Sequence, residues 1–504
     1  MTFRVTNRMM YNNTLISLNR QNEGMLKSQE ELASGKRVNR PSDDPLAASD
    51  IMRYKLLLGR NEKFQEIDSR AASSLNTSES YVGSAGELSV RARELAIQQS
   101  NATATAATRR TAAHEIHTMI EQAIQIGNTQ LQGGYIFSGR TSNIAPLDSS
   151  GNYVGDYSAI TAGISEGHQM DISVLASDFL TADLHPRLSN TTPVSTLNGG
   201  GGISAGSFTI TDRAGGTGTI TVGAGNSIGN VINAINASGA NVTASISSDG
   251  MAIEITDNTA LASINQSLTI AESGGTTAAD LGIVGSRPLS AFTGDNLNPA
   301  LTGSTLLSDL YGGSGITFDD ISVVNGSASA TISFSTATTV SDVISAINGS
   351  GANVTASINS AGTSLSLASN NSATVAYAKD INGNTAEMLG IGGGKNLITT
   401  LQRLEAALNA DDLTGILGQL ENLDTAIGNI SELRGIIGAR VNRIENTRYN
   451  LEIANFNTTV QLSEVQDADM AKAASDLALL QFAYQATAKA SASIIQPSLL
   501  DFLR

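Results

Sequence analysis

The stretch ILGQLENLDTAIGNISELRGIIGARVNRIENTRYNLEIANFNTTVQLSEV, residues 416–465, repeats an apolar side chain every seven positions. Seven of the eight positions on that repeat are apolar: Ile416, Leu423, Ile430, Ile437, Ile444, Leu451, Thr458 and Val465. A heptad sustained over this length predicts a coiled-coil helix of roughly 70 Å, at about 1.5 Å per residue. The glycines between residues 415 and 438 weaken its first half, where we expect a break. A second break is expected at Asp467-Ala-Asp469, followed by a last helix from about Met470 to Ile495.

The N-terminal end mirrors this pattern. Tyr11, Leu18, Met25 and Leu32 lie seven apart on a first predicted helix, which Gly35 would end. Pro45 suits the first turn of a second helix that reaches about residue 100, and a third helix is predicted at about 105–131. Asp43 and Asp44 precede the second helix, where helix capping explains both carboxylates better than a bound cation does.

Glycine content and charge set the middle of the chain apart from both ends. Residues 133–394 hold 38 of the 49 glycines, and they carry 5 Lys and Arg against 19 Asp and Glu. The two flanks together carry 25 basic and 27 acidic residues. This division predicts near-neutral helical ends around an acidic, glycine-punctuated and β-rich centre.

The centre contains an internal repeat. The segment Val231–Ile246 recurs further along the chain as Val343–Ile358, with 14 of 16 positions identical. Alternating polar and apolar runs flank each copy at corresponding distances: Thr219–Val222, Met251–Ile255, Thr331–Phe334 and Thr363–Leu367. The repeat predicts a β-β-α-β-β module that is present twice in tandem.

Composition narrows the classes of function. The 504 residues carry a net charge of −16, and an acidic surface repels phosphate backbones, which argues against nucleic-acid binding. The absence of cysteine excludes disulfides, thiolate nucleophiles and Cys-ligated zinc. No run of about 18 apolar residues predicts a membrane span. The N-terminal stretch lacks the apolar core of a cleaved signal peptide. We therefore expect a cytoplasmic chain, or one that leaves the cell by another route.

No catalytic constellation emerges from the polar residues. His114-Glu-Ile-His117 places its histidines three apart, one short of the zinc-helix spacing, so we interpret it as a solvated helix face. The glycines of Gly223–Gly229 are spaced one residue too far apart for a dinucleotide loop, and the corresponding Ser335–Ser341 contains no glycine. We therefore expect no enzyme activity, no cofactor and no metal site.

Both ends of the chain resemble the flagellin family of bacterial axial proteins. The N-terminal resemblance lies in Leu32-Ala-Ser-Gly-Lys-Arg-Val-Asn-Arg-Pro-Ser-Asp-Asp-Pro45. Four further segments are similar to the hook-associated branch of that family: Gly134-Tyr-Ile-Phe-Ser-Gly139, Asn152-Tyr-Val-Gly-Asp156, Val465-Gln-Asp-Ala-Asp469 and Leu499-Leu-Asp-Phe-Leu-Arg504. The two central repeats resemble the flagellin hook IN motif.

The resemblance implies a structural protein of the bacterial flagellum that joins hook to filament and is exported unfolded through the flagellar type III apparatus. Its implied partners are further copies of itself, the other hook-associated junction protein, flagellin and an export chaperone, with no nucleic acid and no membrane. Filament flagellin is the alternative, which self-polymerisation into long filaments would favour; the segments 134–139 and 499–504 speak against it. An enzyme carried on the repeats is disfavoured because the two copies share no acid/base or metal set.

Together these patterns predict an α+β multidomain fold. Residues 1–45 with 470–504 are expected to form a helical coiled-coil layer, and 46–180 with 395–469 a helical bundle with a small β-region. Residues 181–290 and 291–394 are expected to form the two β-rich modules. The heptad seams serve either as monomer core or as a surface that also meets neighbouring subunits. The residues predicted for subunit assembly are Tyr11, Leu18, Met25, Leu32, Ile437, Ile444, Leu451, Met470, Leu477 and Leu480.

Overall fold

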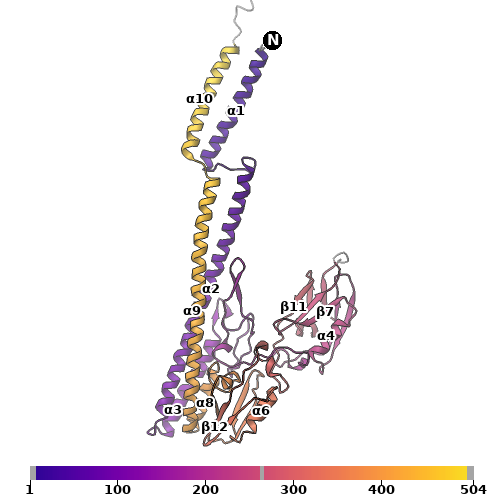
Figure 1. Cartoon of the computed structure of the whole chain (residues 1–504), viewed down its shortest axis with the longest axis vertical. Coiled ribbons are helices and arrows are strands. Elements are labelled where there is room, and N and C mark those ends of the chain that lie inside the picture. The colour runs from indigo at the N-terminus through magenta and orange to yellow at the C-terminus, as the bar shows by residue number, and fades with distance from the viewer. Residues whose placement is uncertain (1–6, 261–265, 496–504) are drawn as a thin grey trace, which may run out of the picture. The chain divides into compact units, whose positions relative to one another are not determined.

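The computed structural model describes residues 7–260 and 266–495, and two compact units make up the chain (Figure 1). Unit 1 comprises residues 1–70, 163–169 and 443–504, and unit 2 comprises 71–162 and 170–442. The longer helices lie towards the two ends of the sequence: α1 (Asn7–Ser34), α2 (Pro45–Gln99), α3 (Ala106–Gly127), α8 (Leu397–Asn409), α9 (Leu413–Gln466) and α10 (Met470–Ile495). The predicted α+β fold is confirmed.

The start of α2 follows the chemistry expected of its sequence. Pro45 is its first residue, and the Asp44 carboxylate accepts a 3.1 Å hydrogen bond from the backbone N–H of Ala47, as a capping residue does. Asp43 accepts the backbone N–H groups of Asn39 and Arg40. These bonds lower the pKa of both carboxyl groups below their usual value. Both carboxylates therefore have protein partners.

The break expected in the first half of α9 is absent, because the helix runs from Leu413 to Gln466 without interruption. Gly418 lies directly against the ring of Tyr377, where a Cβ would overlap the aromatic carbons. Here glycine lets another part of the chain approach a continuous helix closely. At Gly428, by contrast, a Cβ would meet open space.

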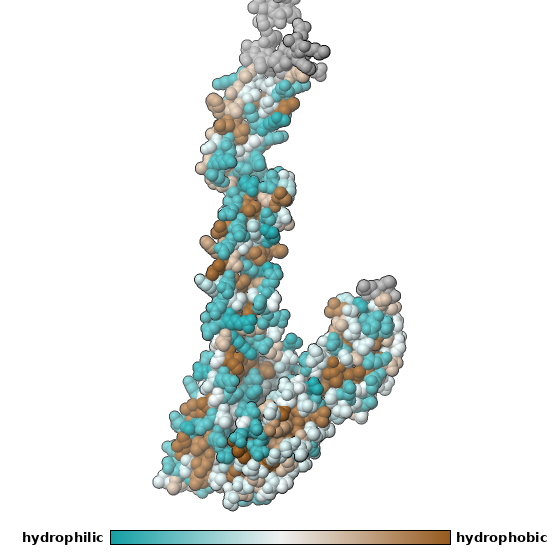
Figure 2. Space-filling model, in the orientation of Figure 1, coloured by the Kyte–Doolittle hydropathy of each residue, from teal (hydrophilic) through white to brown (hydrophobic). Residues whose placement is uncertain are grey.

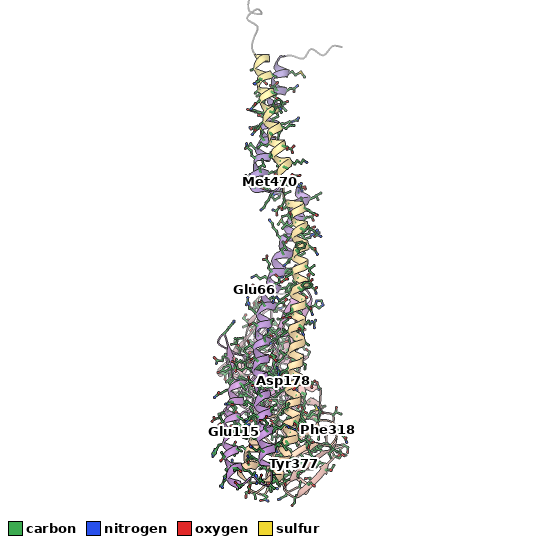
Figure 3. All side chains as sticks on the ribbon, turned by 90° about the vertical axis from the view of Figure 1, so that its left-hand side faces the viewer. Glu66, Glu115, Asp178, Phe318, Tyr377 and Met470 are labelled. Carbon is green, nitrogen blue, oxygen red and sulfur yellow. The ribbon has the colours of Figure 1, made fainter. Side chains whose placement is uncertain are left out.

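Unit 2 contains two pairs of helices. Residues 71–99 of α2 lie along α9, where Gly86 meets Ile430 and Glu79 forms a 2.7 Å ion pair with Arg434. Helix α3 packs against α8, and its residue Ile116 is fully buried. Short strands form a small hairpin in unit 2, β1 (Gln130–Leu131) with β2 (Gly134–Tyr135). A second hairpin pairs β3 (Thr161–Ser165) with β4 (His168–Asp171), and its residues 163–169 belong to unit 1. Figure 3 shows these helices from the side, with Glu115 on α3 and Tyr377 labelled.

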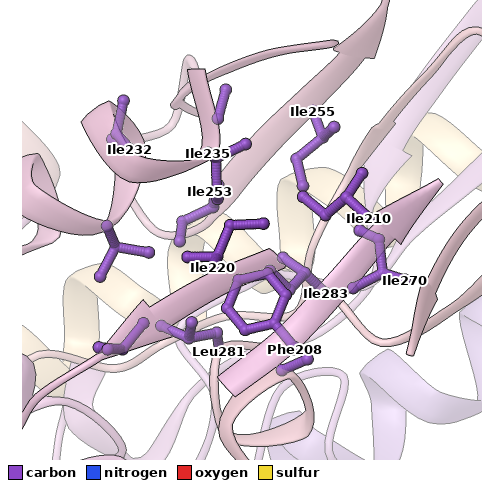
Figure 4. Packing of buried hydrophobic residues seen from close by; sticks show 14 of the residues in the cluster. Phe208, Ile210, Ile220, Ile232, Ile235, Ile253, Ile255, Ile270, Leu281 and Ile283 are labelled. Atoms are coloured by element: carbon purple, nitrogen blue, oxygen red, sulfur yellow. The ribbon is translucent and has the colours of Figure 1, made fainter. Parts of the chain in front are cut away.

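The first module packs two small sheets and a helix around one core (Figure 4). Its sheets have the strand orders β10-β9-β5-β6 and β11-β8-β7. The side chains of Phe208, Ile210, Ile220 and Ile253 are buried at the centre. The elements are β5 (Gly206–Thr211), β6 (Thr217–Val222), α4 (Ile228–Asn236), β7 (Val242–Ile246), β8 (Ile253–Asp257), β9 (Leu268–Glu272), α5 (Thr277–Asp280), β10 (Gly285–Arg287) and β11 (Ala291–Thr293).

The second module repeats the order of strands and helices of the first. Its described elements include no equivalent of β10 and β11. Its sheets are β13-β12-β16 and β14-β15. Its elements are β12 (Ile321–Asn325), β13 (Ala328–Ile332), α6 (Val340–Asn348), β14 (Val354–Ile358), β15 (Leu365–Ser369), β16 (Tyr377–Asp380) and α7 (Thr385–Met388). The predicted β-β-α-β-β order is present twice, and each module has a further strand, β9 or β16, that the repeat did not predict. The four-part domain division remains a prediction.

The two modules enter and leave the rest of unit 2 at neighbouring points. The backbone N–H of Ala182 donates to the side-chain oxygen of Asn396 at 3.4 Å. A Cβ built on Gly390 would lie 3.0 Å from that of Ala182. The segment 182–391 is therefore inserted between adjacent positions, as an inserted domain usually is.

Candidate assembly surface

The two terminal helices pair with each other in unit 1. Helices α1 and α10 lie side by side and run in opposite directions (Figure 1). The side-chain amide of Gln21 donates a 3.0 Å hydrogen bond to the hydroxyl of Thr487. One turn further along, Gly24 lies against Leu480, whose Cδ1 would be 3.2 Å from an added Cβ. Residues from opposite ends of the sequence thus form one seam.

Five of the predicted assembly residues on these two helices are half-buried. Leu18, Met25 and Leu32 on α1 are half-buried, and so are Leu477 and Leu480 on α10. Small or polar residues fill the layers between them: Ser28, Ala473 and Ser491 are buried. A pair of helices cannot enclose its seam completely, which explains why these leucines retain partial exposure.

The other predicted residues are placed less uniformly. Ile437 and Ile444 on α9 are fully buried, and Leu451 is half-buried. Met470 opens α10 and is 46% exposed (Figure 3). Tyr11 belongs to α1, but its side chain lies outside the described residues. The predicted set therefore mixes core positions with surface ones.

A clasp joins the interruptions between α1 and α2 and between α9 and α10. The backbone N–H of Arg37 donates to the carbonyl of Gln466 at 2.8 Å, and that of Ala468 donates to the carbonyl of Gly35 at 3.0 Å. Residues Val38, Ala47 and Ile51 are buried beneath it, against Leu462 and Val465. The break between α1 and α2 thus lies beside the break between α9 and α10, and backbone hydrogen bonds join the two.

The apolar surface of unit 1 that faces solvent is larger than the heptad predicts. Figure 2 shows hydrophobic side chains among hydrophilic ones along the terminal helices. Phe482 on α10 is 75% exposed and Phe456 on α9 is 69% exposed. Further large apolar side chains are exposed on the same unit: Leu15, Ile16, Leu26, Leu46, Met52, Leu56, Tyr449, Ile453, Val460 and Leu479. We call these twelve residues the outer apolar set. The heptad did not predict them because it marks only positions that face the partner helix in the chain.

Polar residues interrupt the seam between α2 and α9 within unit 1. The side-chain amide of Asn61 donates to the side-chain oxygen of Asn455 at 2.9 Å. One heptad further on, Asp68 is fully buried, and its carboxylate has no hydrogen-bond partner among the described residues. Burial raises the pKa of Asp68 to about 6, and the positive charge of Arg448 opposes that rise.

A buried cluster of titratable side chains lies in unit 2 around Asp183. The hydroxyl of Tyr157 donates a hydrogen bond to the Asp183 carboxylate, which also accepts the backbone N–H of His185 at 2.7 Å. Burial raises the pKa of Asp183 to about 7 and lowers that of His185 to about 4. The ring of His185 packs on that of Tyr157 with centroids 3.9 Å apart. Each carboxylate oxygen of Asp183 thus has a protein partner, which favours a structural role.

Metal-binding clusters and membrane spans are both absent from the described part of the chain. No group of three or more His, Asp or Glu side chains in residues 7–260 and 266–495 could hold a metal ion. Over the same residues, no helix is long and apolar enough to cross a membrane.

Family models match both ends of the chain and its second module. The bacterial flagellin N-terminal helical region matches residues 5–142, and the bacterial flagellin C-terminal helical region matches residues 420–503. The flagellin hook IN motif matches residues 320–371. The first module shares the sequence of that motif only through the internal repeat.

Individual relatives are similar to parts of the chain. Flagellar hook-associated protein 3 of Salmonella typhimurium is 26% identical over 171 residues, which are 34% of this chain and 54% of that protein. The chain thus spans about half the length of that relative. A flagellin of Listeria monocytogenes is 30% identical over 127 residues, 24% of this chain and 44% of its own. The crystal structure of flagellar hook-associated protein 3 from Legionella pneumophila covers 82% of this chain and 98% of its own, at 16% identity and a TM-score of 0.39.

Proposed function

The chain belongs to the flagellin family, and on that premise we propose that it is a structural subunit of the bacterial flagellum that joins hook to filament. It acts without catalysis, and its partners are further copies of itself, the other hook-associated junction protein and flagellin. It reaches this place through the flagellar type III export apparatus, with the help of an export chaperone. The hook-associated relative supports the junction rather than the filament itself.

The outer apolar set is the observation that carries this proposal. The twelve side chains of this set are among the large apolar side chains that stand exposed on unit 1, an arrangement that a monomer in water does not need. Burying one such side chain contributes about 1.5–3 kcal/mol. Because every copy in a ring or helical assembly repeats the same contacts, several buried side chains per copy give a stable joint.

The half-buried seam has a complementary role in this proposal. Leu18, Met25, Leu32, Leu477 and Leu480 hold α1 against α10, so that one chain presents both terminal helices together. Ile437, Ile444 and Leu451 do the same for α9 on its inner side. Neighbouring subunits then cover the outer apolar set and complete the partial burial of the seam.

Filament flagellin is the second candidate, favoured by the similarity to the Listeria flagellin. One experiment separates the two. Purified protein is mixed with isolated hooks bearing the other junction protein, with flagellin added in a second step, and the products are examined by electron microscopy. A junction subunit forms a short cap on the hook and lets flagellin extend from it. A filament flagellin grows long filaments by itself, and no binding to hooks would contradict the junction proposal.

A further inference from the structure

Two short connectors lead into the two modules and share a sequence pattern. The first is Leu184-His-Pro-Arg-Leu188, and the second, which follows the first module, is Leu297-Asn-Pro-Ala-Leu301. Each has a leucine at both ends and a proline in the middle. All four leucines are buried, with at most 4% of their surface exposed.

The two leucines of each connector belong to different hydrophobic cores. Leu188 and Leu297 pack in the core of the first module. Leu184 and Leu301 pack in the core of the second module. Leu184 therefore completes a module whose own strands begin only at Ile321, after the whole first module.

The backbone hydrogen bonds of each connector also go to both modules. Leu297 N–H donates to the Met251 carbonyl at 2.9 Å in the first module, and Leu184 N–H donates to the Thr363 carbonyl at 2.8 Å in the second. Leu188 N–H donates to Gly250 and Leu301 N–H to Gly362, both at 2.7 Å. Met251 and Thr363 occupy equivalent positions of the repeat, as do Gly250 and Gly362.

The backbone conformation supplies an independent sign of the same relationship. His185 and Asn298, the second residues of the connectors, have positive φ angles of 39° and 35°. Their carbonyls accept the N–H groups of Gly312 and Gly199, at 2.9 and 2.8 Å. Left-handed non-glycine residues are uncommon, so their recurrence at equivalent positions indicates one shared arrangement.

We propose that the two modules form a single closed domain with approximate two-fold symmetry, in which the first connector crosses over to complete the second module. The first module is completed by the chain that follows it, through Leu297. In the second module the chain leaves after Ile391 toward α8, so no following segment can take that place. Leu184 fills it from the other end of the insertion.

The halves of this domain differ at one polar contact. The side chain of Arg187 forms a 3.0 Å ion pair with Asp309, next to the backbone bond from Arg187 N–H to the Asp309 carbonyl. At the equivalent place Ala300 N–H donates to Thr196, and neither side chain carries a charge. The ion pair therefore distinguishes the crossing connector from its counterpart.

One connector cannot serve both sites of one module. Gly362 and Thr363 are consecutive, so their Cα atoms lie about 3.8 Å apart. Leu184 and Leu188 are four residues apart, and even a helical turn, at about 1.5 Å per residue, would leave their Cα atoms about 6 Å apart. Pro186 disfavours that turn, so the segment is more extended still. A chain with only one module would therefore place Leu184 into a second copy of itself, giving a two-fold symmetric dimer by reciprocal exchange.

The first test uses two leucines of one connector in the full-length protein, followed by hydrogen–deuterium exchange. Leu184→Ala should accelerate exchange of β12–β16 by at least about tenfold and leave β5–β9 protected, because truncating a buried leucine opens the core in which it sits. Leu188→Ala, four residues away, should do the reverse. If both variants loosen the same module, the crossing connector is disproved.

The second test deletes residues 189–301 from the full chain, which joins Leu188 to Thr302 and leaves one module with one connector. Size-exclusion chromatography with light scattering should show a dimer at concentrations where the undeleted chain is monomeric. Adding Leu184→Ser to the deletion should abolish that dimer. A monomer whose remaining module stays protected from exchange would overturn the proposal.

Discussion

The side-chain amide of Asn61 donates a 2.9 Å hydrogen bond to the side-chain oxygen of Asn455, across a seam whose other layers are mostly apolar. Asn61 is buried, so the bond replaces water that the amide would otherwise need. A single polar pair of this kind fixes the register of two helices, because any slip leaves both amides without partners.

Replacing Asn61 alone with leucine should destabilise unit 1 by about 1–3 kcal/mol, since Asn455 then loses its partner in the seam. The double variant Asn61→Leu/Asn455→Leu should recover most of that loss. Chemical denaturation of the four proteins of this double-mutant cycle measures the coupling. Additive effects of the two substitutions would show that the pair does not act as a unit.

Phe482→Asp should abolish incorporation at the hook tip and leave the melting temperature of the monomer unchanged, because the side chain is 75% exposed and supports no contact within the chain's core. The matched control is Gln481→Asp, an exposed neighbour about 100° around the same helix. The assay is attachment of flagellin to hooks, scored by electron microscopy. Equal attachment by Phe482→Asp and the control would remove this face from the assembly surface.

Asp68 predicts a pH dependence of stability in unit 1. Burial raises its pKa to about 6 in the folded chain, above the usual value near 4, so the folded state binds a proton that the unfolded state has released. The free energy of unfolding should therefore fall as the pH rises from about 4 to about 6, and should contain no further change from Asp68 above that range.

Asp68→Asn removes this titration and should flatten the profile, with a higher melting temperature than the natural protein at pH 7.5. Thermal denaturation between pH 4 and 8 measures both chains. Parallel profiles for the two would show that Asp68 keeps an ordinary pKa.

Two glycines of α9 should respond to alanine in opposite directions. Gly428→Ala fills open space on an exposed helix face and should stabilise unit 2 by about 0.5–1 kcal/mol. Gly418→Ala forces the ring of Tyr377 away from α9 and should destabilise it, despite the same gain in helix propensity. Thermal denaturation of the two variants measures both effects. If both substitutions raise the melting temperature, the ring of Tyr377 is free to move.

The heptads were sufficient to predict α1 and α9, because apolar side chains at a helical period must be covered along one face. They did not predict that α9 would be continuous. Glycine lowers helix propensity everywhere, but only the folded chain shows that the ring of Tyr377 fills the space at Gly418. Tertiary packing decided that position against local preference.

The candidate assembly surface shows a similar limit. Sequence analysis singled out Leu18 and Leu477, which are half-buried on α1 and α10, and it passed over Phe456 and Phe482, which face outward. A period in the sequence identifies the face of a helix that meets the nearest partner. Such a period carries no information about the outer apolar set, which other molecules would cover.

Likewise, the internal repeat revealed the two modules but not the connectors that link them. Leu184 lies before the first module in sequence, whereas Thr363, its hydrogen-bond partner, lies in the second. A local sequence pattern cannot show that two such distant segments are in contact. The sequence shows only that the two connectors share the pattern Leu-X-Pro-X-Leu.

The neighbouring ends of the insertion at Ala182 and Gly390 have a consequence for how such a chain changes over generations. The whole insertion can be gained or lost at this point without displacing the flanking segments of the folded chain, because the insertion begins and ends at neighbouring positions. The same point offers engineers a socket, into which a foreign domain with adjacent termini can be spliced and displayed in as many copies as the assembly contains.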